Sequence, residues 1–230
     1  MVLADEVYQD NIYDDDKEFI SAKKAAHELG LIEANAIELA SFHSTSKGLY
    51  GECGHRGGYV EMVGFDEKVL DHFYKLASSG LCANSNGQIM TALMTRGPQP
   101  GDASYERHEQ EKTTILTELK AKAKMMADGL NAIPGFKCQP AQGAMYCFPR
   151  IENMPAKAIE AAKAANSTPD TLYALSLLRS TGICVVPASG FGQKPGRYGF
   201  RTTFLPSIEE MEKALQQFAR HHEEFCQKYA

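Results

Sequence analysis

A single lysine lies among small hydroxyl side chains and glycines in the segment 40–59, ASFHSTSKGLYGECGHRGGY. Three hydroxyl residues, 44–46, come directly before Lys47, and Arg56 follows nine residues after it. A lysine amine that is partly removed from water has a lowered pKa, and it then acts as a nucleophile or a base. Serine hydroxyls and a bidentate arginine bind phosphate groups. The segment therefore predicts an amine nucleophile beside a phosphate site.

The elements that would position this segment are those of an α/β layer. The expected strands lie at 2–4, 36–42 and 58–63, and a helix is expected at 19–29. Strands separated by helix-length segments predict a parallel or mixed sheet, in which ligands bind at the carboxyl ends of the strands. Asp5, Tyr8 and the segment 44–47 all follow such strand ends. A reactive amine beside a phosphate site favours pyridoxal phosphate as the cofactor.

The second half of the chain predicts a different arrangement. Its expected elements are a long helix at 104–130, strand-like pieces within 136–151, a helix at 168–182, a strand at 183–186 stopped by Pro187, and a last helix from Ser207. The apolar stripe of the last helix runs through Met211, Leu215, Phe218, His222 and Phe225. As two adjacent polar residues, the pair His221–His222 is nevertheless expected on the solvated side of this helix. We expect a partial large, cofactor-binding domain at 1–103, a connecting helix at 104–130, and a small C-terminal domain at 131–230.

The composition of the 230 residues is that of a soluble globular protein, with 43% hydrophobic and 23% charged residues. A net charge of -5 argues against nucleic acid or an anionic membrane as the main partner. No apolar run reaches the roughly 18–20 residues of a membrane span. The six cysteines are scattered and read as reduced thiols of a cytosol-like compartment. Cys53 and His55 lack further ligands at metal-binding spacing, so that no metal site is expected.

Four motifs, in this order along the chain, resemble those of a known family. The segment 5–8, DEVY, matches the Asp-x-x-Tyr of the fold-type-I, class I pyridoxal-phosphate-dependent aminotransferases. The segment 44–47, STSK, with Arg56 downstream, resembles the cofactor-lysine motif of that family. The segment 182–192, GICVVPASGFG, resembles its small-domain segment, and 200–206, FRTTFLP, the segment with its substrate-binding arginine. Any one motif is weak evidence, but four in the right order are strong evidence.

The spacing within the lysine motif points to one branch of the family. Arg56 lies one residue further from Lys47 than in the general class I pattern. The extra residue in KGLYGECGHRGGY resembles the alanine aminotransferase branch. The resemblance covers nearly the whole chain and implies an α/β fold, namely the C-terminal part of the large domain, with a mostly parallel sheet, and an α+β small domain.

The resemblance also implies a role for each residue of the motifs. Lys47 would bind the cofactor covalently and then move a proton during the reaction. Asp5 would pair with the pyridine nitrogen, and Tyr8 would bind the ring oxygen and assist catalysis. The phosphate would be bound by Ser44, Ser46 and Arg56, and the substrate α-carboxylate by Arg201. Taken alone, each of these residues also has a structural interpretation, such as a turn former, a strand aromatic or a member of an ion pair.

The reaction implied is L-alanine plus 2-oxoglutarate to pyruvate plus L-glutamate, in a cytoplasmic or mitochondrial homodimer. Two alternatives remain open at this point. The first is another aminotransferase with the same cofactor, of the glutamate–glyoxylate or aromatic type. The second is a non-catalytic fragment that acts as a binding or dimerisation module.

The resemblance further implies an enzyme of roughly twice this length. The glycine-rich phosphate turn, the aromatic residue that stacks on the ring and the asparagine that binds the ring oxygen are not found in the sequence. We therefore expect either a fragment, a truncated product or a chain that needs another polypeptide. Taken alone, such a chain is expected to have little or no transaminase activity.

Overall fold

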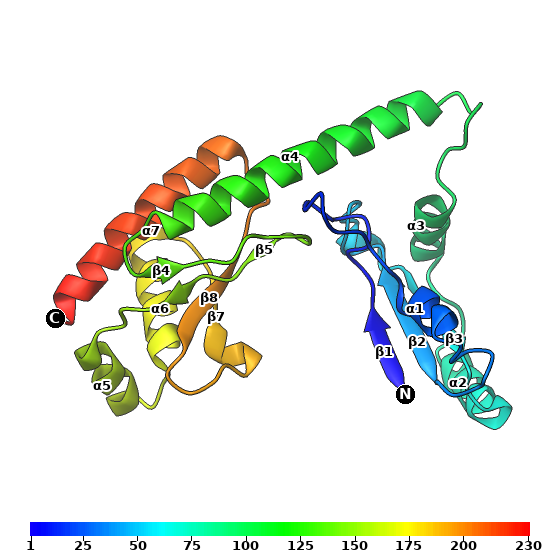
Figure 1. Ribbon diagram of the computed structural model, residues 1–230, viewed down its shortest axis with the longest axis horizontal. Coiled ribbons are helices and arrows are strands. Elements are labelled where there is room, and N and C mark those ends of the chain that lie inside the picture. Colours follow the sequence, from blue (N-terminus) through cyan, green and yellow to red (C-terminus); the bar gives the residue numbers. More distant parts are fainter. The chain divides into compact units, whose positions relative to one another are not determined.

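A computed structural model describes residues 1–230, and the chain divides into two compact units, Met1–Leu116 and Thr117–Ala230 (Figure 1). The boundary falls inside helix α4, Tyr105–Asn131. The assignment of 1–103, 104–130 and 131–230 to a cofactor-binding domain, a connecting helix and a small domain stays a prediction. No helix combines the length and the apolar character that crossing a membrane requires.

The first unit is built on a sheet of three strands in the order β1-β2-β3. Its elements are β1 Val2–Asp5, α1 Ala22–Glu28, β2 Leu39–Ser44, the 3-10 turn η1 Cys53–His55, β3 Gly58–Val63, α2 Glu67–Ser79 and α3 Ser85–Thr95. Strands β1 and β2 are parallel, whereas β2 and β3 are antiparallel, so the sheet is mixed. The parallel pair carries the carboxyl ends of both strands to the same edge.

The second unit combines short strands with three helices and the C-terminal part of α4. Its remaining elements are β4 Phe136–Lys137, β5 Tyr146–Cys147, β6 Arg150–Ile151, α5 Ala156–Ala164, α6 Pro169–Thr181, β7 Val186–Pro187, the 3-10 turn η2 Ala188–Phe191, β8 Tyr198–Thr203 and α7 Ile208–Lys228. Strands β5, β6 and β7 all pair antiparallel with β8, and β4 pairs with β6. Strands β5 and β6 share one register against β8, because Cys147 lies opposite Thr202 and Arg150 opposite Gly199.

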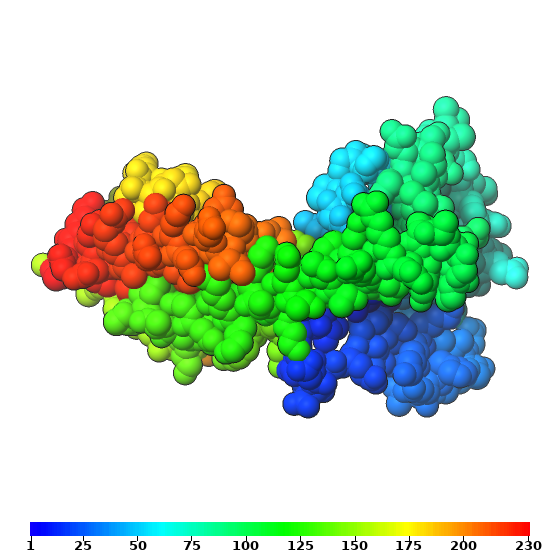
Figure 2. Space-filling model, turned by 90° about the horizontal axis from the view of Figure 1, so that it is seen from above, coloured from blue at the N-terminus to red at the C-terminus, as the bar shows by residue number.

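Helix α7 covers the core of this unit together with α4 and α6. Figure 2 shows α7, in orange and red, beside the C-terminal part of α4, in green. Gly129 of α4 makes this approach close, since a Cβ at this position would come within 2.4 Å of Cδ1 of Leu215. The largest fully buried side chains of the unit are Tyr173, Phe200, Phe204, Phe218, Met126, Leu130, Leu177, Met211 and Asp170.

The paired histidines at the end of the chain correct a sequence prediction. Each of His221 and His222 is only 3% exposed, which confirms the place of His222 in the apolar stripe and contradicts the expected solvated position of the pair. Together with Phe218 and Phe225 they follow the spacing i, i+3, i+4, i+7, which places all four on one helix face. Burial lowers the pKa of His222 to about 4, and the neighbouring His221 acts in the same direction. Burial also lowers the pKa of His221.

Three element boundaries differ from the sequence predictions. The helix expected at 19–29 is shorter, because Ser21 caps it and accepts a hydrogen bond from the Lys24 backbone N–H. The strand expected at 36–42 spans Leu39–Ser44 instead, where it pairs first with β1 and then with β3. The strand expected at 183–186 is wrong in most of its length: β7 is Val186–Pro187 and includes the proline. A proline is tolerated there because β7 pairs with β8 alone.

Candidate active site

The residues predicted to bind a cofactor meet at the carboxyl edge of β1 and β2. Asp5, the last residue of β1, lies opposite Phe42 in the parallel register. The next backbone N–H, that of Glu6, donates to the Phe42 carbonyl at 3.1 Å. On the other segment, a Cβ on Gly48 would lie 2.6 Å from the Val7 carbonyl oxygen. The chain around Lys47 therefore packs directly against the segment that carries Asp5 and the half-buried Tyr8.

The side chains of Asp5 and Lys47 are both exposed at this edge. Neither forms an ion pair within the chain. The sequence suggested a lysine partly removed from water, but the Lys47 side chain is exposed in the turn that follows β2. Its amine is accessible to a ligand.

The hydroxyl residues before Lys47 fix the loop that leads to Arg56. Thr45 is 1% exposed, and both its backbone N–H and its Oγ1 donate to the Gly57 carbonyl at 3.1 Å. Ser44 Oγ donates to the same carbonyl at 3.2 Å and accepts from the Ser46 N–H at 3.1 Å. The loop is thereby tied to the residue that follows Arg56.

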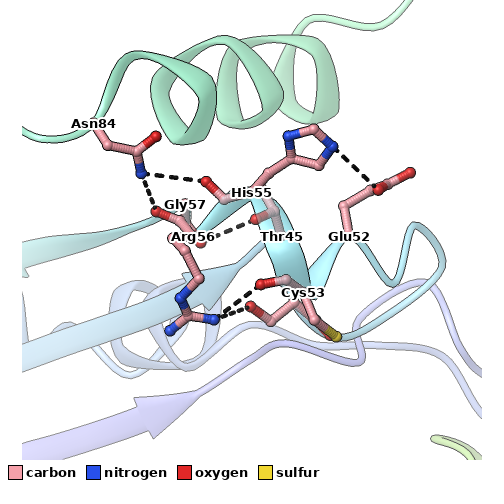
Figure 3. Close-up of polar contacts among 8 residues, drawn as sticks. Thr45, Glu52, Cys53, His55, Arg56, Gly57 and Asn84 are labelled. Atoms are coloured by element: carbon pink, nitrogen blue, oxygen red, sulfur yellow. Dashed lines mark hydrogen bonds and ion pairs between the residues drawn. The ribbon is translucent and has the colours of Figure 1, made fainter.

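The Arg56 side chain turns back toward the hydroxyl segment (Figure 3). Its Nη1 donates to the Cys53 carbonyl at 3.0 Å and to Ser46 Oγ at 3.4 Å. The nearby carboxylate of Glu52 pairs instead with His55, at 3.6 Å between Oε2 and Nε2. The guanidinium therefore has no carboxylate partner and keeps donors for an added anion. A cation, serine hydroxyls and an accessible amine on one loop fit the donor set that a phosphorylated aldehyde cofactor needs.

The predicted substrate arginine lies in the second unit, on β8. Its guanidinium carbon is 4.6 Å from the ring centroid of Tyr146 and 4.8 Å from that of Phe191. Phe191 in turn meets Phe148 edge to face, at 5.4 Å between centroids. Arg201 forms no ion pair within the unit, so that two aromatic rings hold its guanidinium and leave its N–H edges for a carboxylate.

Two residues near Arg56 were not predicted from the sequence. Thr45 was given no role of its own from the sequence, and the structure shows that it is buried and hydrogen-bonded to the Gly57 carbonyl. Asn84, the residue before α3, donates from Nδ2 to the carbonyls of His55 and Arg56. The available signal was an asparagine directly before a helix, the position of an N-cap. No cluster of three or more residues able to hold a metal ion is found in residues 1–230.

Comparison with known proteins shows which family the chain belongs to. Residues 1–218 match the family described as aminotransferase class I and II. The chain belongs to this family. The resemblance noted from the four motifs is therefore confirmed.

The similar curated proteins include alanine aminotransferases and glutamate–glyoxylate aminotransferases. Alanine aminotransferase 2 of Panicum miliaceum is 51% identical over 229 residues, which are 100% of this chain and 47% of that protein. Glutamate–glyoxylate aminotransferase 2 of Arabidopsis thaliana is 46% identical over 230 residues, which are 100% of this chain and 48% of that protein. The chain spans about half the length of these relatives.

Solved structures confirm the predicted fold class. An alanine aminotransferase from Pyrococcus furiosus superposes with a TM-score of 0.72 at 27% identity, over 96% of this chain and 49% of that one. An aspartate aminotransferase from Rhizobium meliloti gives a TM-score of 0.73 at 24% identity, over 99% of this chain and 50% of that one. The second likeness concerns the fold alone.

Proposed function

We propose that the chain carries the cofactor-lysine part of a pyridoxal-phosphate-dependent aminotransferase that converts L-alanine and 2-oxoglutarate to pyruvate and L-glutamate. The observation that carries this proposal is the loop on which Lys47, Ser46 and an arginine without a carboxylate partner lie together, at the edge where β1 ends in Asp5. Family membership and the alanine aminotransferase names of several relatives support the same reaction.

The roles of the residues follow from their chemistry. Bound pyridoxal phosphate supplies an electron sink that stabilises negative charge at the substrate Cα. Arg56, Ser44 and Ser46 would hold the phosphate, with the guanidinium as the charged donor. The Asp5 carboxylate would keep a proton on the pyridine nitrogen, since a negative charge beside that nitrogen favours its protonated form.

Proton transfer and substrate binding fall to the remaining residues. The Lys47 amine would hold the cofactor and then take the proton from the substrate Cα, because a neutral amine is a base of suitable strength. The Tyr8 hydroxyl would donate a hydrogen bond to the oxygen on the cofactor ring. Arg201 would bind the α-carboxylate that alanine and glutamate share, which explains how one site accepts both.

A second candidate reaction would use the same residues. Glutamate–glyoxylate aminotransferases 1 and 2 of Arabidopsis thaliana are 45% and 46% identical to the chain. A glyoxylate-using enzyme would use the same Lys47, Arg56 and Arg201, because the amino acid and keto acid still present an α-carboxylate. A panel of amino donors and keto acids, assayed on the same preparation, separates the two reactions. For either one we propose a homodimer located in the cytoplasm, with the mitochondrion as the alternative.

The test of the cofactor assignment is chemical labelling. After incubation with pyridoxal phosphate, borohydride should fix the cofactor to a peptide that contains Lys47, as identified by mass spectrometry. The variant Lys47→Ala should lose the label, and it should also lose the absorbance band that bound pyridoxal phosphate gives in the wild type. Lys17→Ala is the matched control, since this lysine lies in the same unit, outside the loop, and should leave labelling unchanged. An adduct mainly on another lysine would overturn the assignment.

A further inference from the structure

Asn84 joins helix α3 to the turn that carries Arg56. Its Oδ1 accepts a hydrogen bond from the Gly87 backbone N–H at 2.9 Å, which caps the helix. Its Nδ2 donates to the His55 carbonyl at 3.2 Å and to the Arg56 carbonyl at 3.0 Å, and Figure 3 shows this amide above the turn. Capping the helix uses only the amide oxygen, so the two donor bonds need another reason.

The turn that Asn84 contacts has an unusual backbone. Arg56 has a φ of 55°, in the left-handed region that favours glycine. Because arginine has a β-carbon, the backbone is strained at this position. A non-glycine residue in this conformation is strained, and it persists only where its surroundings fix it. The direction of the Arg56 side chain depends on this backbone conformation, because the φ and ψ angles set the direction of the Cα–Cβ bond.

Close packing between the turn and α3 supplies the rest of the support. A Cβ on Gly87 would lie 2.4 Å from the Arg56 carbonyl oxygen, and a Cβ on Gly57 would lie 2.5 Å from the Gly87 carbonyl oxygen. The Gly57 carbonyl accepts hydrogen bonds from the hydroxyls of Thr45 and Ser44. The amide of Asn84 is the side-chain donor that reaches the Arg56 carbonyl itself.

We infer that Asn84 is a positioning residue for phosphate recognition: it holds the Arg56 turn in the left-handed conformation that directs the guanidinium toward Ser46. The inference rests on the proposed function, because it assigns a phosphate to Arg56. It goes further in naming a residue on another element that sets the geometry of the anion site without touching the ligand.

The test compares pyridoxal phosphate with pyridoxal, which lacks the phosphate, by titration of the full chain. Asn84→Ser keeps a good helix cap but is too short to reach both carbonyls. We expect this variant to bind pyridoxal phosphate about three- to tenfold more weakly, the effect of one or two hydrogen bonds, and to bind pyridoxal as the wild type does. Asp66→Ser is the matched control, since Asp66 caps α2 in the same unit.

A second variant keeps the test valid if the serine variant is destabilised. Asn84→Thr also keeps a neutral cap oxygen and lacks the amide that reaches both carbonyls, so it should show the same selective loss. Equal weakening of pyridoxal and pyridoxal phosphate, or no weakening, would overturn the role of Asn84. A wild type that binds both compounds equally would instead overturn phosphate binding by Arg56, and with it both the proposed function and this inference.

Discussion

At the scale of single residues, the two candidate arginines, one in each unit, are held in different ways. Arg56 donates to a backbone carbonyl and a serine hydroxyl, whereas Arg201 lies between the rings of Tyr146 and Phe191. Stacking fixes the plane of a guanidinium without using its N–H groups. Arg201 is therefore oriented in advance for a planar, two-oxygen ligand.

This arrangement predicts the effect of removing Arg201. Arg201→Ala should weaken L-alanine and L-glutamate alike, since both present the same α-carboxylate, by on the order of 2–5 kcal/mol for a lost charged pair. Affinity for pyridoxal phosphate should change little. The measurement is a pair of titrations, one with each amino acid, on the cofactor-loaded protein. Arg197→Ala is the control, since this exposed arginine lies just before β8, and unchanged amino acid affinity in Arg201→Ala would make Arg201 structural.

The residues of the site differ in how far their sequence context identifies them. Lys47 and Arg56 could be named as candidates, because their spacing resembles the cofactor-lysine motif of the family, and their roles stay predictions. The exposure of Lys47 could not be predicted, because it depends on what covers the turn. Asn84 could not be predicted either, because its partners, the carbonyls of His55 and Arg56, are 29 and 28 residues away in the chain.

At the scale of elements, helix α7 shows how spacing decides burial. Phe218, His222 and Phe225 pack on the same side as Tyr173 of α6 and Phe200 of β8, with ring centroids 5.8 Å apart for Tyr173 and His222. Polar character favoured a solvated position for the histidine pair, but the helical period overrides it because the whole stripe faces the sheet. Periodicity predicted the existence of the helices well, whereas the two-residue strands β4 to β7 are too short to carry a periodic signal.

The buried His222 predicts how stability depends on pH. Its pKa is about 4 in the folded chain and 6.5 in the unfolded one, so the unfolded state binds more protons between these values. Stability is fully present above pH 6.5 and falls as the pH drops toward 4, by about 2 kcal/mol at pH 5.

The measurement is urea unfolding followed by circular dichroism at pH 7 and pH 5. His222→Gln should reduce the loss between the two pH values, whatever its effect at pH 7. His72→Gln, at an exposed position on α2, is the control and should lose as much as the wild type. An equal pH dependence in His222→Gln and the wild type would contradict the assignment.

At the scale of the whole molecule, the two units have unequal cores. The buried apolar side chains of the first unit are Tyr13, Ala26, Leu39 and Ala40. The second unit buries a much larger set, with aromatic residues such as Phe136, Tyr173, Phe200 and Phe225 in mutual contact. Large apolar residues of the first unit remain exposed, among them Tyr74 at 74% and Leu81 at 86%. The sequence alone could not reveal this imbalance, because its apolar residues are spread over both halves.

The unequal cores predict that the two units open with different free energies. Burial of apolar area contributes roughly 25 cal/mol per Å², so the second unit should be the more stable. Strands β3, Gly58–Val63, and β8, Tyr198–Thr203, offer a matched comparison, since each has six residues. Four residues of β3 are exposed and none is buried, whereas β8 contains the buried Gly199 and Phe200.

In hydrogen exchange measured by mass spectrometry under native conditions, the β3 amides should therefore exchange well before those of β8. Addition of pyridoxal phosphate should slow exchange in the first unit more than in the second, because a ligand that binds the folded state raises its opening free energy. The proposed contacts of the phosphate with Ser44, Ser46 and Arg56 all lie in that unit. Protection in β3 equal to that in β8, without any ligand, would contradict the view that the loop of Lys47 and Arg56 is built on the less stable half of the chain.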